Sequence, residues 1–262
     1  MLYQRILSAA VGIPVLLAAV WRGGWLLFAA TVLIMLLSLY EFDRLFLLTE
    51  TKTSFFIMAA GMLVLSAGAL WGGVGFYGLA VVPVVMIILI SGVLSYPGVT
   101  PAGVAVRLTG TLYISLFIYF YLIRTLDGGQ LWILTLLAAI WAGDTLAYFT
   151  GKKLGKRKLA PELSPGKTVE GAVGGLAGGI LGAFGVYLLF PSLPPGQVLA
   201  VSAVAGVFGI IGDLFESSLK RQGGIKDSGN IIPGHGGVLD RFDSLIFAAP
   251  AVYYLLAFWP IG

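Results

Sequence analysis

The chain has 262 residues, of which 58% are hydrophobic and 11% are charged, and its formal net charge is +4. A soluble domain carries about 25% charged residues, so this composition excludes an ordinary soluble enzyme and indicates a chain that lies mostly in lipid. The absence of cysteine excludes disulfides, thiolate metal sites and thiol nucleophiles.

Nine apolar stretches follow one another along the chain, and each is close to the roughly 20 residues that a spanning helix needs. They predict an all-α, polytopic integral membrane protein. Arg5 before an apolar run resembles the start of a signal peptide, but the many later stretches favour a first spanning helix. The first two stretches are short enough to form a single hairpin around a tight turn at residues 21–24. The nine stretches lie at about 6–21, 25–40, 54–70, 75–95, 104–123, 130–149, 169–190, 198–219 and 241–259.

The lysines and arginines predict the orientation, because cytoplasmic loops carry an excess of both. With the N-terminus in the cytoplasm, nine crossings bring the C-terminus outside, and only Arg22 and Arg124 of the sixteen basic residues then lie outside. We expect a multi-pass protein of the inner, cytoplasmic membrane. Residues 1–125 are expected to hold the N-terminal helices and residues 126–262 the catalytic helices and cytoplasmic loops, unless the two parts form one continuous membrane domain.

The seventh stretch carries two ladders of glycines at four-residue spacing: Gly171, Gly175 and Gly179, and Gly174, Gly178 and Gly182. Small residues at this spacing let helix backbones approach closely, and this packing replaces the hydrophobic force that lipid cannot supply. We therefore interpret the stretch as a packing helix without a direct chemical role.

Two acids, Asp144 and Asp213, lie inside apolar stretches. A charge at the centre of a spanning helix costs roughly 2.5–3.5 kcal/mol, so each acid needs a compensating partner. Each precedes a lysine by seven or eight residues, which places both carboxylates roughly 10–12 Å below the cytoplasmic helix ends. The equal depth favours a cation shared by the two helices, while pairing of each acid with a lysine or arginine stays open. Glu216, Ser217 and Lys220 extend the face of Asp213, and such a polar stripe is typical of a cavity wall.

The segment from Lys220 to Asp243 is the densest in polar residues, with six glycines, three aspartates and the only histidine of the chain. Asp240 and Asp243 stand at i and i+3 where the last helix begins, so both can face one ion. Proteins often hold Mg²⁺ with one or two carboxylates together with substrate phosphates. The convergence of four acids with basic residues is a stronger indication of a cation site than any of these acids alone. His235, between two glycines, is interpreted as a turn residue or hydrogen-bond donor rather than a catalytic base.

The basic loop at residues 152–168 ends in Ser-Pro-Gly-Lys-Thr, which superficially resembles a phosphate-binding P-loop. Pro161 occupies the place of the motif's first glycine and no β-strand is expected before it, so we reject a P-loop. A helix that begins near Thr168 still offers free N–H groups and a positive dipole to an anion. The cluster at 152–158 fits anion binding and topogenic charge equally well, whereas Lys167 beside the helix start favours an anion.

Three motifs resemble those of the phosphatidate cytidylyltransferases, also called CDP-diacylglycerol synthases. The longest, S-x-x-K-R-x-x-x-x-K-D-x-G-N-x-x-P-G-H-G-G-x-x-D-R-x-D, runs from Ser217 to Asp243. The other two are GDTLAYFTGKKLGK at 143–156 and SPGKTVEG at 164–171. The family usually has a lysine where this chain has Gly166, which removes one candidate phosphate contact. The resemblance is strong over the C-terminal half, whereas the first 130 residues match only in hydropathy.

The resemblance implies that CTP and phosphatidic acid give CDP-diacylglycerol and pyrophosphate, with Mg²⁺ required and a second, monovalent cation left open. The residues expected to be catalytic are Asp213, Asp240, Lys220, Lys226 and Arg241. Those expected to bind substrate are Asp144, Lys167, Thr168, Ser217, Arg221, Asp227, His235, Gly236 and Gly237. The expected metal ligands are Asp213, Asp240, Asp144 and Asp243. Asp213 and Asp240 are expected to share one cation in a polar cavity open to cytoplasm and lipid.

Three other functions compete with this one. Another CTP-using lipid enzyme, such as an archaeal-type lipid cytidylyltransferase or a polyprenol kinase, is the nearest. An ion-coupled transporter also buries acids at mid-membrane, but the first half of the chain lacks counterparts to Asp144 and Asp213. A structural scaffold leaves these acids unexplained. The expected partners are CTP, phosphatidic acid of the inner leaflet and membrane lipid, without nucleic acid, and the sequence leaves open whether the chain forms a homodimer.

Overall fold

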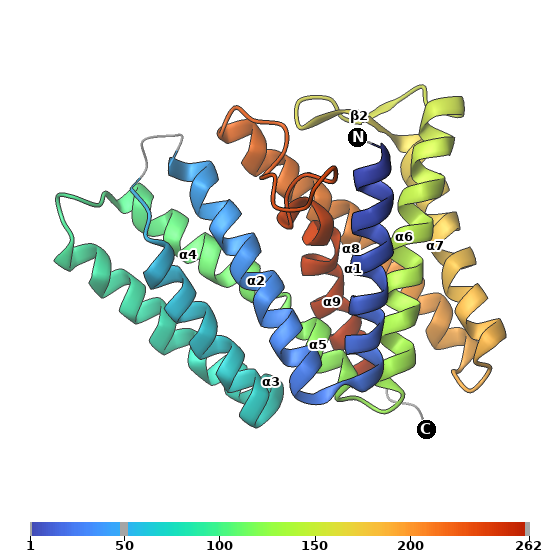
Figure 1. The fold of residues 1–262 in the computed structure, drawn as a ribbon, viewed down its shortest axis with the longest axis horizontal. Helices are drawn as coiled ribbons and strands as arrows, with labels where there is room; N and C mark the ends of the chain where they lie inside the picture. Colours follow the sequence, from blue (N-terminus) through green and yellow to red (C-terminus); the bar gives the residue numbers. More distant parts are fainter. Residues whose placement is uncertain (1, 48–51, 260–262) are drawn as a thin grey trace. The chain divides into compact units, whose positions relative to one another are not determined.

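The computed structural model describes residues 2–47 and 52–259 (Figure 1). The chain divides into two compact units, one comprising Met1–Leu122 and Leu219–Phe242, the other Ile123–Ser218 and Asp243–Gly262. The elements in chain order are α1 (Leu2–Arg22), α2 (Gly24–Leu47), α3 (Phe55–Leu94), α4 (Pro101–Ser115), α5 (Ile118–Arg124), α6 (Gly129–Leu154), β1 (Lys158–Ala160), β2 (Ser164–Thr168), α7 (Val169–Leu189), α8 (Pro195–Gln222) and α9 (Leu239–Phe258).

Eight helices within the described residues are long and apolar enough to cross a membrane. This finding confirms the predicted all-α, polytopic membrane class. Helices are the expected solution because a helix satisfies all its backbone hydrogen bonds within one segment, which lipid requires. The fifth predicted stretch corresponds to α4 and α5 together, and the third and fourth both fall on α3. The number of crossings and the orientation stay predictions.

The long helix α3 folds back on itself, which Figure 1 shows in its blue-green segment. The helical conformation is interrupted at Gly72 (φ −140°, ψ 17°) and Gly73 (φ 63°, ψ −151°). A side-chain carbon on Gly68 would lie 2.9 Å from the backbone oxygen of Phe76, so the two halves approach closely. A straight helix of 40 residues is about 60 Å long, twice the roughly 30 Å of a hydrocarbon core. The bend therefore gives two halves that each match one bilayer thickness.

The first unit is built around α2. Its side chains Leu27, Met35, Leu39 and Phe42 are fully buried. The predicted tight turn before α2 is present, since α1 ends at Arg22 and α2 begins at Gly24. Gly23 and Gly24 both have positive φ, at 66° and 53°, a conformation that glycine adopts without steric cost.

The second unit contains the pair α6 and α7, which lie side by side along much of their length (Figure 1). Both glycine ladders of α7 face α6. A side-chain carbon on Gly175 would lie 3.1 Å from Ala147 Cβ, and one on Gly178 would lie 2.7 Å from the Ala142 oxygen. The interpretation of this segment as a packing helix is therefore confirmed.

The expectation of no strand before α7 is wrong. Strands β1 and β2 form an antiparallel hairpin in which Lys158 pairs with Thr168 and Ala160 with Ser164, and β2 contains the Ser-Pro-Gly-Lys-Thr sequence itself. The carboxylate of Glu170 accepts the backbone N–H groups of Lys156 at 3.0 Å and Arg157 at 3.2 Å. These bonds fasten the start of the hairpin to the first turn of α7. A paired strand is extended backbone, so this segment is not the phosphate-encircling loop of a P-loop protein.

Candidate functional site

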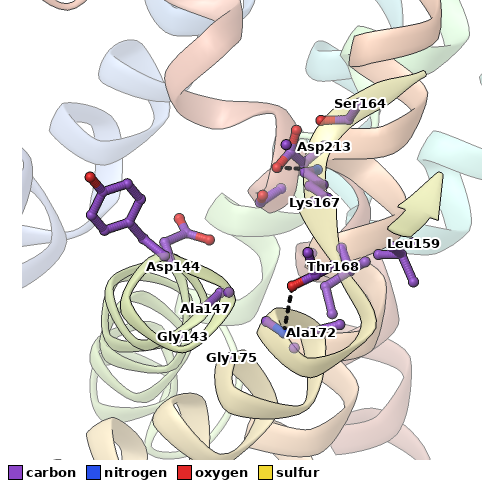
Figure 2. A pocket seen from close by; sticks show the side chains of 18 of the residues that line it. Gly143, Asp144, Ala147, Leu159, Ser164, Lys167, Thr168, Ala172, Gly175 and Asp213 are labelled. Atoms are coloured by element: carbon purple, nitrogen blue, oxygen red, sulfur yellow. Dashed lines mark hydrogen bonds and ion pairs between the residues drawn. The ribbon is translucent and has the colours of Figure 1, made fainter. Parts of the chain in front are cut away.

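A cavity of about 620 Å³ lies in the second unit; we call it the Asp213 cavity. Four of its polar side chains come from three elements: Asp144 from α6, Lys167 and Thr168 from β2, and Asp213 from α8. Figure 2 shows these side chains together with the small residues of α6 and α7 around them. The structure thus brings together four residues that the sequence analysis placed in one site.

Lys167 and Asp213 form an ion pair through Lys167 Nζ and Asp213 Oδ2, drawn as a dashed line in Figure 2. Their side chains are 25% and 35% exposed, so a ligand entering the cavity can reach both. The Ser217 hydroxyl lies 3.5 Å from Asp213 Oδ1. Pairing with a lysine, the alternative left open for this acid, is therefore the arrangement in the structure.

The position of Lys167 follows from the start of α7. Thr168 is the N-cap of this helix: its backbone is extended (φ −126°, ψ 155°), and its hydroxyl accepts the Gly171 N–H at 3.0 Å. Such a cap satisfies one of the helix's open N–H groups. The helix predicted to begin near Thr168 therefore begins there, and Lys167 stands directly before it, where the helix dipole favours an anion.

Three acids in the second unit lie close together: Asp213 and Glu216 of α8, and Asp243 of α9. One carboxylate oxygen from each falls within 4.8 Å of the others. Glu216 is fully buried and Asp243 is 8% exposed. Three carboxylates at this spacing form a donor set for a metal ion. The sequence analysis placed Glu216 on the polar stripe of α8 without making it a ligand, although its i+3 spacing from Asp213 was the signal. Asp144 lies outside this group of three, and its role stays a prediction.

Other predicted residues lie in the first unit, where Asp240 is the centre of a hydrogen-bond network. Its Oδ1 accepts Lys220 Nζ at 2.8 Å, and its Oδ2 accepts the backbone N–H groups of Ser228 at 3.0 Å and Gly237 at 2.9 Å. The side chains of Lys220 and Asp240 are 14% and 6% exposed. The Asp240 carboxylate therefore connects Ser228 and Gly237, in the loop of residues 223–238, to Lys220 of α8. The prediction that Asp240 is also a metal ligand stays a prediction.

Glu41 of α2 also forms hydrogen bonds with this loop and with the start of α9. It is 1% exposed, and its Oε2 accepts the Leu239 N–H at 2.8 Å and the Ser228 hydroxyl at 3.2 Å. A side-chain carbon on Gly229 or Gly237 would overlap the Glu41 carboxylate, so both glycines are required for this approach. The sequence analysis missed Glu41 because the predicted second stretch ended one residue before it.

The remaining predicted residues lie on or near the surface of the first unit. Arg221, Lys226 and Asp227 are exposed, and the Arg241 side chain donates from Nε to the His235 carbonyl at 3.0 Å. His235 Nδ1 lies 2.7 Å from the Ser8 hydroxyl, which agrees with the hydrogen-bonding role expected for this residue.

The Asp213 cavity places a lysine beside carboxylates in a chain whose described helices include eight that are long and apolar enough to cross a membrane. Residues 3–259 match the model of the cytidylyltransferase family. The chain therefore belongs to this family and is a nucleotidyltransferase.

Three relatives illustrate the similarity. A phosphatidate cytidylyltransferase of Bacillus subtilis is 50% identical over 150 residues, which are 56% of this chain and 55% of that protein. Phosphatidate cytidylyltransferases of Staphylococcus aureus and Staphylococcus epidermidis are 34% and 35% identical, with 96% of this chain and 98% of each relative covered. All three relatives are bacterial.

Proposed function

We propose that this protein transfers the cytidylyl group of CTP to phosphatidic acid, which gives CDP-diacylglycerol and pyrophosphate. The observation that carries the proposal is the Asp213 cavity, which is lined by Lys167, by Asp144 of α6 and by Asp213 of α8. A reaction between two phosphate compounds needs positive charge to neutralise the phosphates, and a lysine together with carboxylates that can hold Mg²⁺ would supply it. Relatives that are aligned with 96% of this chain are phosphatidate cytidylyltransferases, which supports the same reaction.

The donor set of Asp213, Glu216 and Asp243 fits Mg²⁺, because this ion prefers carboxylate oxygens and completes its shell with water and substrate phosphates. When bound, Mg²⁺ would neutralise charge on the phosphates of CTP. Asp240 is proposed as a further ligand on the strength of the motif resemblance. Titration with K⁺ tests for a second, monovalent cation.

The chain's own residues then have defined tasks. A phosphate oxygen of phosphatidic acid attacks the α-phosphorus of CTP, and the bond from that phosphorus to the pyrophosphate oxygen breaks. The attacking oxygen is already anionic, so no strong base is needed, and catalysis reduces to positioning and charge neutralisation. Lys167 would exchange its bond with Asp213 for one with a substrate phosphate. The first N–H groups of α7 would face the same anion.

The loops at residues 152–168 and 223–238 are proposed to face the cytoplasm, where CTP is dissolved. The excess of lysine and arginine in these loops supports this orientation. Phosphatidic acid would enter from the inner leaflet of the bacterial cytoplasmic membrane. A cysteine introduced at Lys156 should react with an impermeant maleimide only when the cytoplasmic face is exposed; reaction from the outside would reverse the orientation.

The experiment that tests the reaction is pyrophosphate release by the purified protein in detergent. Release should require CTP, phosphatidic acid and Mg²⁺ together, and CDP-diacylglycerol should appear in equal amount. Asp213→Asn and Asp240→Asn should abolish turnover, whereas the loop variant Asp127→Asn should retain it. A folded wild-type protein that phosphorylates a polyprenol, or that moves an ion across sealed vesicles without using CTP, would refute the proposal.

A further inference from the structure

A second cavity, of about 680 Å³, lies in the first unit; we call it the His235 cavity. Its wall combines Arg5 of α1 and Arg241 of α9 with Asp227, Asn230 and His235 of the connecting loop. The two arginines come from segments more than 200 residues apart in the sequence. The lining is therefore polar, and two of its side chains carry a permanent positive charge.

Both arginines are anchored to the loop in the same way. Arg5 Nε donates to the Gly234 carbonyl at 2.8 Å, and Arg241 Nε donates to the next carbonyl, that of His235, at 3.0 Å. Gly234 and Gly236 have φ of 78° and 87°, so glycines on both sides of His235 create the turn that presents these carbonyls. A guanidinium has five N–H groups in a planar fork. Anchoring through Nε fixes the fork and leaves the N–H groups of the terminal nitrogens to other partners.

We propose that the His235 cavity binds a phosphate group of a substrate between Arg5 and Arg241. A guanidinium fork matches two phosphate oxygens at once, and the anchors already hold both forks in place, so little conformational entropy is lost on binding. Asp227 contributes one negative charge against the two guanidiniums, which leaves the cavity positive. Arg5 is exposed, so the ligand can reach it.

The pKa of His235 is lowered in this cavity. Burial, and then the positive charges of Arg241 and Arg5, lower the pKa of His235 below its ordinary value of 6.5. Only the contribution of the two arginines to this shift carries the sign of a positively charged cavity, which attracts an anion. The neutral ring bonds to the Ser8 hydroxyl through Nδ1 at 2.7 Å, so α1 contributes both a cation and a contact that holds the loop.

The inference rests on the proposed function for the source of the phosphate, which is either the triphosphate of CTP or the headgroup of phosphatidic acid. Both offer the same chemistry to a guanidinium. They differ in solubility and can be varied separately in one assay, so the kinetic constants of a single variant distinguish them.

The variant is Arg5→Ala in the full-length protein in detergent. We expect the KM of one substrate to rise about tenfold or more, the effect of losing one charge-assisted hydrogen bond, while kcat changes less than about threefold. A higher KM for CTP together with weaker inhibition by inorganic pyrophosphate assigns the site to the nucleotide, and a higher KM for phosphatidic acid alone assigns it to the lipid. Arg5→Lys should recover part of the loss.

Two controls separate the cation from its structural contacts. Arg22→Ala removes the other arginine of α1 and should leave both KM values unchanged. Ser8→Ala removes the contact with His235 and keeps the charge, so its KM values should stay within about threefold of the wild type. Equal effects of Ser8→Ala and Arg5→Ala, or KM values for Arg5→Ala within twofold of the wild type, would overturn the proposal.

A binding titration makes the outcome independent of turnover. The affinities of wild type and Arg5→Ala for inorganic pyrophosphate and for a soluble short-chain phosphatidic acid are compared by calorimetry. If the wild type shows no CTP-dependent reaction but Arg5→Ala still weakens one of these affinities about tenfold, the proposed function fails and the phosphate site stands. Unchanged affinities for both probes overturn the site even if the enzyme is active.

Discussion

Glu216→Gln tests whether the three neighbouring acids Asp213, Glu216 and Asp243 form a metal site. The carboxylate oxygens of Asp213, Glu216 and Asp243 lie within 4.8 Å of one another, and at this separation two ionised carboxylates repel by about 3.5 kcal/mol at an effective dielectric constant of about 20. Glu216 is fully buried, so water screens its charge little. Glutamine keeps the shape and one oxygen but removes the charge. In the absence of metal, the substitution therefore relieves the repulsion among the three carboxylates. In the presence of metal, it weakens their attraction for the cation.

The two effects have opposite signs in a thermal-unfolding assay. In chelator, Glu216→Gln should melt at or above the temperature of the wild type. With Mg²⁺, the wild type should gain stability according to its affinity for the ion, whereas the variant should gain much less. Loss of one charged ligand should weaken the apparent Mg²⁺ affinity about tenfold or more, equivalent to about 1.4 kcal/mol, and turnover should fall with it.

The exposed acid Glu162 provides a matched control. Glu162→Gln makes the same chemical change in a solvated loop and should reproduce the wild-type Mg²⁺ response. Repeating the titration with K⁺ tests the monovalent cation that the sequence left open. If Glu216→Gln and the wild type show the same Mg²⁺-dependent shift and the same Mg²⁺ dependence of turnover, the three acids are not the metal site.

Four further outcomes are expected. Lys167→Met should lower kcat/KM about 10- to 100-fold through loss of a phosphate contact, yet change stability by less than about 1 kcal/mol because the pair is partly exposed; steady-state kinetics and thermal unfolding check both. Gly178→Ala should destabilise by about 1–3 kcal/mol through overpacking against α6, while Gly185→Ala, which meets open space, should be neutral or stabilising in the same unfolding assay. Glu41→Ala should lower the melting temperature more than Glu41→Gln, because glutamine keeps an oxygen acceptor and alanine leaves buried donors unsatisfied. His235 has a lowered pKa in the fold, so its contribution to stability is present above its unfolded-state pKa and is lost as the pH falls through the folded value; melting temperatures at pH 8 and pH 5.5 should differ less in His235→Asn than in the wild type.

The helices could be predicted because lipid leaves the backbone few choices. Apolar stretches of sufficient length become helices, and the glycine spacing of Gly175 and Gly179 indicated close packing before any partner was known. The hairpin at Lys158–Thr168 could not be predicted in this way. Its strands of three and five residues carry no apolar alternation, and they are held by pairing with each other and by the carboxylate of Glu170.

A site residue could be predicted where its own surroundings in the sequence are anomalous, and it was missed where only a contact with a distant residue reveals its role. Asp213 and Lys167 stood out as an acid in an apolar stretch and a lysine before a helix. Glu41 lies just beyond the predicted second stretch, and its partners Ser228 and Leu239 lie almost 200 residues away, so no local pattern marked it. For Arg5 the sequence indicates only a basic residue before the first apolar stretch, because its contact with the loop exists only in three dimensions.

Glycines allow the acidic residues of this chain to come close to their neighbours, because a residue without a Cβ permits close backbone approach. A side-chain carbon on Gly212 would lie 2.5 Å from the Asp243 carbonyl oxygen, so the approach of α8 to α9 that brings Asp243 near Asp213 and Glu216 depends on a residue without a Cβ. Gly237 plays the corresponding part beside Glu41. In lipid, helices that present polar groups gain little from hydrophobic burial, and close backbone contact supplies the packing energy instead. The glycines of α8 and of the loop are therefore as necessary for this arrangement as the acids, because they set the distance between the segments that carry the acids.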